Sequence, residues 1–112
     1  VYDQYAGLKS NNLNYTIASV TNDLSSVSEG FGLQGASKTQ TSGGPFSYTS
    51  PYNGISNNVG ITNSTIREIF NTSNNPIVAG RASFLLKAKS SNTTPGSNDY
   101  TDTLTLIATG SF

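Results

Sequence analysis

The chain has 112 residues, which fits one domain of ordinary size and leaves no room for two cores. Six basic and six acidic residues cancel, and no basic stripe exists, which argues against nucleic acid as a partner. Cysteine is absent, which excludes disulfides and thiolate metal sites, and no apolar run approaches the roughly 18 residues of a membrane span.

Polar uncharged residues dominate the composition, because serine, threonine and asparagine together make up 44 residues. This bias suits strands and turns and works against long helices. The first strand is predicted over residues 13–20, where apolar and polar residues alternate, with Asn11 and Asn12 forming a turn before it. A second strand is predicted over residues 30–36, followed by a surface loop over residues 37–44.

The middle of the chain predicts a hairpin. Phe46 and Tyr48 alternate with small polar residues, and Asn53-Gly54 follows as a two-residue turn, because both residues tolerate positive φ. This turn would pair the strand of Phe46 and Tyr48 with a segment starting at Ile55. Residues 64–70 are ambiguous, since their apolar positions fit either one helical turn or a strand.

The last third of the chain carries the clearest alternation. Residues 82–89 predict a strand with Phe84, Leu86 and Ala88 on one face, and residues 90–99 predict a loop. Residues 100–109 predict a final strand, with a row of threonines on one face. Its opposite face carries Tyr100, Leu104, Leu106 and Ala108. Strands at this spacing predict an all-β fold, an antiparallel β-sandwich, with a barrel or jelly roll as the alternative.

Motifs that carry chemistry are weak in this sequence. The glycines of residues 30–35 match dinucleotide-binding spacing, but the residues that follow cannot form the required helix. Histidine is absent, no Ser-x-x-Lys occurs, and the spacing of the six carboxylates selects no catalytic pair. Asp99 and Asp102 lack calcium-loop spacing. We therefore expect no enzyme activity, no cofactor and no metal site.

Four asparagines satisfy the Asn-X-Ser/Thr rule for glycosylation. Composition alone predicts about that many matches, so the count is no evidence of modification. Asn92 is the best candidate because it lies in a predicted loop, and Asn63 and Asn71 are further candidates. Asn14, inside the first predicted strand, is the poorest.

The final segment resembles the closing strand of chaperone–usher and spore-coat-U-like pilins, which end in a Gly…Tyr-Thr-Asp-Thr-hydrophobic pattern. The matching residues run from Pro95-Gly96 through Tyr100-Thr101-Asp102-Thr103 to Leu106. Residues 13–17 resemble a Gly-Tyr-Thr-Val strand of such domains, and residues 45–54 resemble their Pro-Tyr…Tyr-Asn-Gly hairpin. Together these segments cover about a third of the chain, and the chain begins close to the Tyr15 strand, whereas such subunits have a longer N-terminal half.

The resemblance implies one immunoglobulin-like sandwich over residues 1–112, completed by a strand from a neighbouring subunit. Residues 1–10 would be an extended N-terminal segment, with residues 1–9 as the candidate donor. Leu104, Leu106 and Tyr100 would form the subunit interface. The implied function is a structural subunit of an extracellular filament, pilus or coat. Its partners would be copies of itself or related subunits and an assembly chaperone. The missing methionine at position 1 fits removal of an initiator or a signal peptide.

Two other functions remain open at this point. A glycan-binding adhesive domain would use aromatic faces to stack on sugars, and Tyr48 and Tyr52 lie near a predicted loop. A viral or phage coat domain is the other alternative, since capsid sandwiches share this polar, cysteine-free composition.

Overall fold

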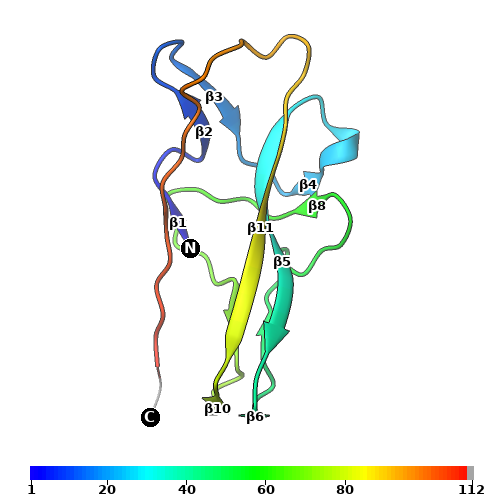
Figure 1. The fold of residues 1–112 in the computed structure, drawn as a ribbon, viewed down its shortest axis with the longest axis vertical. Helices are drawn as coiled ribbons and strands as arrows, with labels where there is room; N and C mark the ends of the chain where they lie inside the picture. The colour runs from blue at the N-terminus through cyan, green and yellow to red at the C-terminus, as the bar shows by residue number, and fades with distance from the viewer. Residues whose placement is uncertain (111–112) are drawn as a thin grey trace.

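The computed structural model describes residues 1–110, which form an elongated all-β structure of 48 × 25 × 20 Å (Figure 1). A single turn of 3-10 helix, η1, covers Leu24–Ser26. The strands are β1 Tyr2–Asp3, β2 Gly7–Ser10, β3 Tyr15–Ala18, β4 Asn22–Asp23, β5 Gly30–Thr39, β6 Ser42–Gly43, β7 Ser47–Tyr48, β8 Asn58–Val59, β9 Phe70–Asn71, β10 Ile77–Val78, β11 Arg81–Lys89 and β12 Leu104–Thr105.

The longest ladder joins β5 to β11 and runs along the centre of the molecule (Figure 1). It extends from the pair Arg81–Thr39 to the pair Lys89–Gly30, with a bulge between Ala82 and Phe84. The other strand pairs are also antiparallel and short: β1 with β12, β2 with β3, β4 with β8, β6 with β10 and β7 with β9.

The second edge of β5 is also hydrogen-bonded. Leu33 and Gly60 exchange two backbone bonds of 3.0 and 2.8 Å, and Gly35 donates to the carbonyl of Tyr52 at 2.8 Å. Val20 donates to the carbonyl of Phe31 at 2.8 Å. Because both edges of β5 are paired over residues 31–35, the backbone polar groups of this part are satisfied and it can lie in the interior.

One face of β5 packs on the main core. Leu33 contacts a group of buried side chains, here called the core cluster, to which Phe84 and Leu104 add partly buried side chains. The core cluster consists of Val1, Leu33, Tyr52 and Ile69. Burying an aliphatic or aromatic side chain of this size stabilises a fold by about 1.5–3 kcal/mol, so this cluster holds the N-terminus, β5 and the loop around Tyr52 together.

Glycines on the opposite face of β5 let a second layer approach closely. A Cβ on Gly30 would meet Leu24 at 3.0 Å, and one on Gly32 would meet the Cγ2 of Val59 at 2.4 Å. Packing against a flat strand therefore explains the glycine spacing of residues 30–35, which form part of a strand and open no helix.

Several predicted elements are confirmed. The strand predicted over residues 82–89 is β11, and the turn at Asn11 and Asn12 joins β2 to β3. Residues 30–36 belong to β5, which continues to Thr39, so the loop predicted from residue 37 begins too early. The sequence prediction missed the length of β5 because its glycines weaken the strand signal. In the fold, the side chains that pack closely against these glycines compensate for the weak strand propensity.

Two local predictions are wrong, and the ambiguity over residues 64–70 is resolved against a helical turn. The Asn53-Gly54 hairpin does not form, because β7 pairs with β9 rather than with a segment from Ile55. Residues 64–70 contain no helical turn. The final strand is paired only over β12, with an isolated bridge between Thr101 and Lys9. Long-range packing overrides the local signals here. The rings of Phe46 and Phe70, for example, pack edge to face at 5.2 Å and draw distant segments together.

The N-terminal segment is folded rather than free. Residues 1–10 contain β1, paired with β12, and β2, paired with β3, so the strand predicted over residues 13–20 is not the first. Val1 is buried in the core cluster, and Asp3 and Ser10 are fully buried. An extended N-terminal tail is therefore absent from the described fold.

Replacing Gly32 with alanine tests the packing of β5. The new Cβ would press against Val59, which is itself buried, and lie 3.0 Å from the carbonyl oxygen of Gly60. We expect Gly32→Ala to lower the free energy of unfolding by about 1–3 kcal/mol in chemical denaturation, because an overpacked core must shift. Gly96→Ala is the control, since nothing lies within 4 Å of its Cβ position, and it should change stability by less than about 0.5 kcal/mol. Equal effects of the two substitutions would contradict this packing.

Candidate functional site

Among the described residues, no strand is hydrogen-bonded to the outer edge of β11, the edge that faces away from β5. Within residues 1–110, the backbone of β11 is hydrogen-bonded to β5 and to no other strand. A free edge of 9 residues presents a row of unpaired N–H and C=O groups. The outer edge of β11 is therefore a template on which a further strand can pair.

The side of β11 that faces the core is incompletely covered. Leu86 pairs with Leu33 across the ladder, so the two side chains lie on the same face of the sheet. Leu33 is 3% exposed, whereas Leu86 is 56% exposed. The difference arises because β5 has neighbours on both edges and β11 has one, so the core cluster ends before it reaches Leu86.

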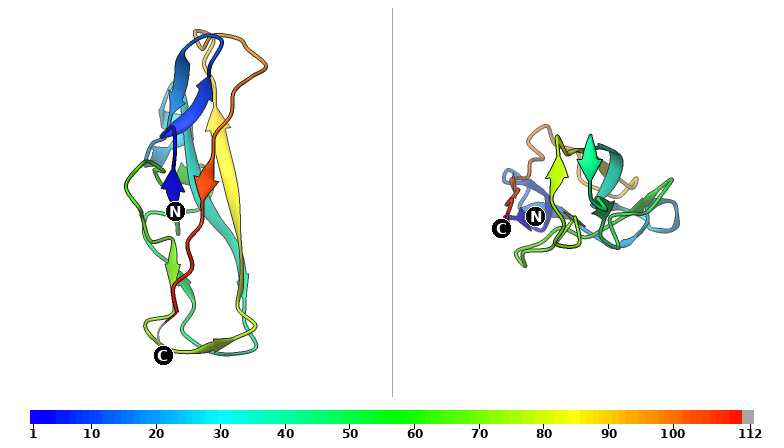
Figure 2. Two further views of the ribbon diagram at one scale, coloured as in Figure 1. Left: turned by 90° about the vertical axis from the view of Figure 1, so that its left-hand side faces the viewer. Right: turned by 90° about the horizontal axis from the view of Figure 1, so that it is seen from below.

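The C-terminal segment borders the same region. β12 and β11 run in opposite directions along one side of the molecule (Figure 2, left), and Leu104 and Phe84 pack against the same core cluster. In the described part of the chain no backbone hydrogen bond joins the two strands. Beyond β12, Leu106 and Ile107 are 60% and 55% exposed.

Lysines often blunt an exposed edge, but those of β11 are engaged elsewhere. The ammonium group of Lys89 donates to the carbonyl of Val27 at 2.7 Å, and that of Lys87 donates to the carbonyl of Ser56. Both lysines alternate with Leu86 along the strand and therefore lie on the opposite face. The core-facing side of the outer edge carries no charge that would repel an apolar strand.

The predicted interface residues lie in different settings. Leu104 packs partly on its own core cluster, and Leu106 is exposed on the unpaired segment. The Tyr100 hydroxyl donates to the carbonyl of Pro95 at 2.6 Å and so closes its own loop. The three residues do not form one exposed surface, and Leu106 is the member that remains free.

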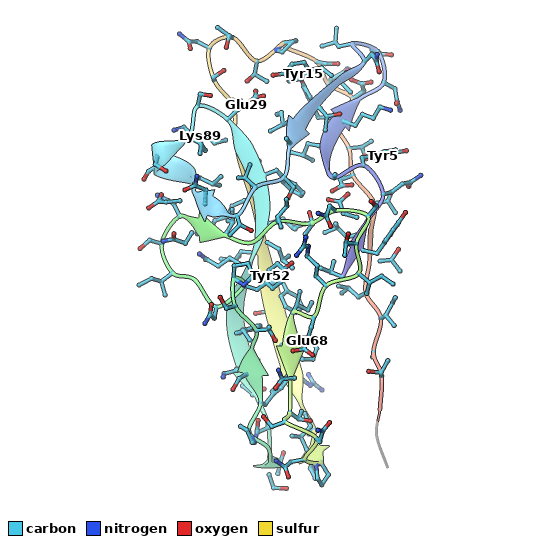
Figure 3. All side chains as sticks on the ribbon, turned by 180° about the vertical axis from the view of Figure 1, so that it is seen from behind. Tyr5, Tyr15, Glu29, Tyr52, Glu68 and Lys89 are labelled. Carbon is cyan, nitrogen blue, oxygen red and sulfur yellow. The ribbon has the colours of Figure 1, made fainter. Side chains whose placement is uncertain are left out.

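The predicted sugar-contacting tyrosines are used inside the fold. Tyr52 is 1% exposed, and its hydroxyl donates to the carbonyl of Ile61 at 2.7 Å, which leaves no ring face for a sugar (Figure 3). The Tyr48 hydroxyl donates to the carbonyls of Ser37 and Ser83, and its ring packs on Phe84 at 5.8 Å. The structure therefore does not support Tyr52 as a glycan contact.

The glycosylation candidates are accessible to different degrees. Asn92 and Asn71 are exposed, and Asn63 is half-buried. Asn14 lies in the exposed turn between β2 and β3 rather than within a strand. Asn71 is in β9, where its side chain donates to Glu68 at 2.8 Å.

Two carboxylates fasten the loop of residues 90–99. Glu29 accepts hydrogen bonds from Tyr15, which points toward it (Figure 3), and from Thr94, both at 2.5 Å. Asp99 accepts from the hydroxyls of Ser10 and Ser97 and from the amide of Asn12. These bonds lower the pKa of Asp99 to about 2.

No group of three or more acidic, histidine or cysteine side chains in residues 1–110 is arranged to hold a metal ion. No helix of the described residues is long and apolar enough to cross a membrane. No family model matches the chain, and no curated protein or solved structure shows a significant match to it.

Sequence reasoning missed the outer edge of β11 as a site. It placed Leu86 on the apolar face of a strand, which reads as a core position. One signal was available in the sequence. Leu85 and Leu86 are consecutive, and successive residues of a strand point to opposite faces, so a sheet covered on one face only must leave one of the two leucines uncovered. Whether the core-facing one is covered depends on long-range pairing.

The acid dependence of stability tests the role of Asp99. Its folded-state pKa lies below the ordinary 3.8, so its contribution is present above pH 3.8 and is lost as the pH falls through about 2. In chemical denaturation, Asp99→Asn should be less stable than the unaltered chain at pH 5, and the gap should close between pH 5 and 2. A gap that stays constant over this range would show that the carboxylate does not fasten the loop.

Proposed function

We propose that this chain is a structural subunit of an extracellular filament, pilus or coat, which assembles by strand addition between subunits. The observation that carries the proposal is the outer edge of β11, where an unpaired strand adjoins a half-exposed core leucine, Leu86. The proposed acceptor is an immunoglobulin-like sandwich that a neighbouring subunit completes. A structural rather than catalytic role also fits a chain without histidine or cysteine.

Strand addition suits this edge for two physical reasons. An incoming strand would supply partners for the backbone groups of β11, which gives affinity that does not depend on its sequence. Alternate side chains of that strand would point toward the core and cover Leu86, which gives specificity for apolar residues at every second position.

The donor is a segment other than the N-terminal one. Residues 1–9 are paired with β12 and β3 and contribute Val1 to the core cluster, so donating them would unfold the subunit that supplies them. Among the described residues, 106–110 are extended, exposed and outside any strand pair. Leu106 and Ala108 are the last two residues of the apolar face predicted for the final strand. We propose residues 106–110 as the donor.

The surface composition and the resemblance to pilins support an extracellular setting. The chain is rich in serine, threonine and asparagine, and 11% of its residues are charged against about 25% in typical soluble domains. An exposed strand edge is prone to unproductive aggregation, so such a subunit would need a dedicated chaperone to protect the outer edge of β11 before assembly.

Two neighbouring leucines of β11 offer a matched test. Leu86→Asp places a carboxylate on the core-facing side of the outer edge, where strand addition would bury it without a partner. Leu85→Asp places the same charge one residue away on the opposite face. Both side chains are about half exposed, so the two substitutions should cost similar amounts, about 1–2 kcal/mol, in the isolated domain.

Electron microscopy and sedimentation of the purified variants give the readout. The unaltered chain and Leu85→Asp should form polymers, and Leu86→Asp should lower the polymer fraction at least ~10-fold, because burying an unpaired carboxylate is strongly unfavourable. A chain that stays monomeric under all conditions, or a Leu86→Asp variant that polymerises normally, would overturn the proposal.

A further inference from the structure

Two carboxyl groups meet where the N-terminal and C-terminal strands join. Asp3, in β1, is fully buried, and its Oδ1 accepts hydrogen bonds from the amides of Tyr5 and Ala6, both at 3.0 Å. Its Oδ2 accepts from the hydroxyl of Thr62 at 2.5 Å. Thr62 is in turn bonded to Ser19, so Asp3 is fixed in place by a buried polar network.

Asp102 supplies the second carboxyl group from the segment before β12. Its Oδ1 accepts from the amide of Thr103 at 2.8 Å, while its Oδ2 is buried without a hydrogen-bond partner among the described residues. Asp3 is paired with Leu104 and the Gln4 amide is bonded to the Thr103 carbonyl, so the backbone places the Asp102 carboxyl group beside that of Asp3, and this neighbour is one cause of the raised pKa of Asp102. Since two carboxylates have no hydrogen to share, this contact is attractive only while one of them is protonated.

Within residues 1–110, no cationic side chain forms an ion pair with Asp3 or Asp102. The N-terminal ammonium group of Val1 donates to the carbonyl of Arg67, and the Arg67 Nε donates to the side chain of Asn63 at 3.3 Å. The Nζ of Lys9 lies over the ring of Tyr5, 5.3 Å from its centre. The groups that donate hydrogen bonds to the Asp3 carboxylate are the amides of Tyr5 and Ala6 and the hydroxyl of Thr62, which do not change charge.

Few bonds hold β12 in place apart from this pair. The ladder between β1 and β12 contains two residue pairs, Tyr2–Thr105 and Asp3–Leu104. Gln4 donates to the carbonyl of Thr103 at 3.1 Å, and Lys9 and Thr101 exchange two bonds. Repulsion between two ionised carboxylates in the middle of so short a contact would therefore weigh heavily against it.

We propose that Asp3 and Asp102 form a proton-operated latch, which holds the C-terminal strand on β1 while they share a proton and releases it when that proton leaves. In the closed state Asp102 donates a hydrogen bond to the Asp3 carboxylate. On release Asp102 gives up this proton to water, two carboxylates then face each other, and residues 101–110 separate from β1. The consequence for assembly rests on the proposed function: residues 106–110 are already unpaired, and release of residues 101–105 extends the reach of this donor segment toward a neighbouring subunit.

The direction of the pH effect follows from the environment of Asp102. Burial, and then the bond to and charge of Asp3, raise the pKa of Asp102 to about 7, far above the ordinary 3.8. Because the pKa of Asp102 is raised in the closed state, its contribution to the stability of that state is complete below pH 3.8. The contribution is lost as the pH rises through about 7. With these two pKa values, the equilibrium constant for closing the latch falls about tenfold between pH 6 and 8.5.

Nuclear magnetic resonance of the monomer at low concentration tests the latch. One aspartate side-chain carboxyl should titrate near neutral pH, and the hydrogen-exchange protection of the Gln4 amide, corrected for intrinsic exchange, should fall about tenfold from pH 6 to 8.5. Asp102→Asn should abolish the titration and keep the protection constant, because its amide donates to Asp3 at every pH. Asp23→Asn is the control: Asp23 lies in β4, which pairs with β8, and hydrogen bonds from Ser25 lower its pKa, so it stays ionised throughout this range and the fall in protection should persist.

Protection of Gln4 that is independent of pH in the unaltered chain, or that falls equally in Asp102→Asn, would overturn the latch. Light scattering, which monitors particle formation, tests the proposed assembly role separately from the latch. If both hold, Asp102→Asn should assemble more slowly than the unaltered chain at pH 8.5. Loss of protection without any particle formation would uphold the latch and contradict the assembly role.

Discussion

The pairing of β5 with its neighbours is the interaction on which the rest of the structure depends. β5 is the strand whose two edges are both hydrogen-bonded over several residues, and Leu33 joins the core cluster from one of its faces. Its glycines let Val59 and Leu24 pack directly against the other face. Because so many short strands are individually marginal, they are stable only through their packing around this one.

The same arrangement leaves β11 paired with β5 on one edge and unpaired on the other. Evolution commonly protects such an edge with charge, bulges or a covering segment. Here the single bulge lies near one end, and the two lysines are bonded across the opposite face. The partly buried Phe84 and the exposed Leu86 lie on the same face of β11, and both are next to its unpaired edge. We propose that the protein uses this open edge to accept a further strand.

Much of the fold class, but little of the topology, could be predicted from the sequence. Period-two alternation identified β11 and its faces, since that pattern is local. The partners of Tyr48 and Phe70 could not be found in this way, because their pairing joins residues more than 20 positions apart and competes with a strong Asn-Gly turn signal. The site was hidden for the same reason: the sequence places Leu86 on the core side of a strand, and only long-range pairing decides whether anything covers it.

Amide hydrogen exchange along β11 tests the central claim most directly. The amides of Arg81–Lys89 that are not bonded to β5 should exchange rapidly in the monomer and become strongly protected in assembled material, because an added strand supplies their acceptors. Amides that are already protected in the monomer would show that the edge is closed. Amides that still exchange rapidly after assembly would show that subunits associate through another surface.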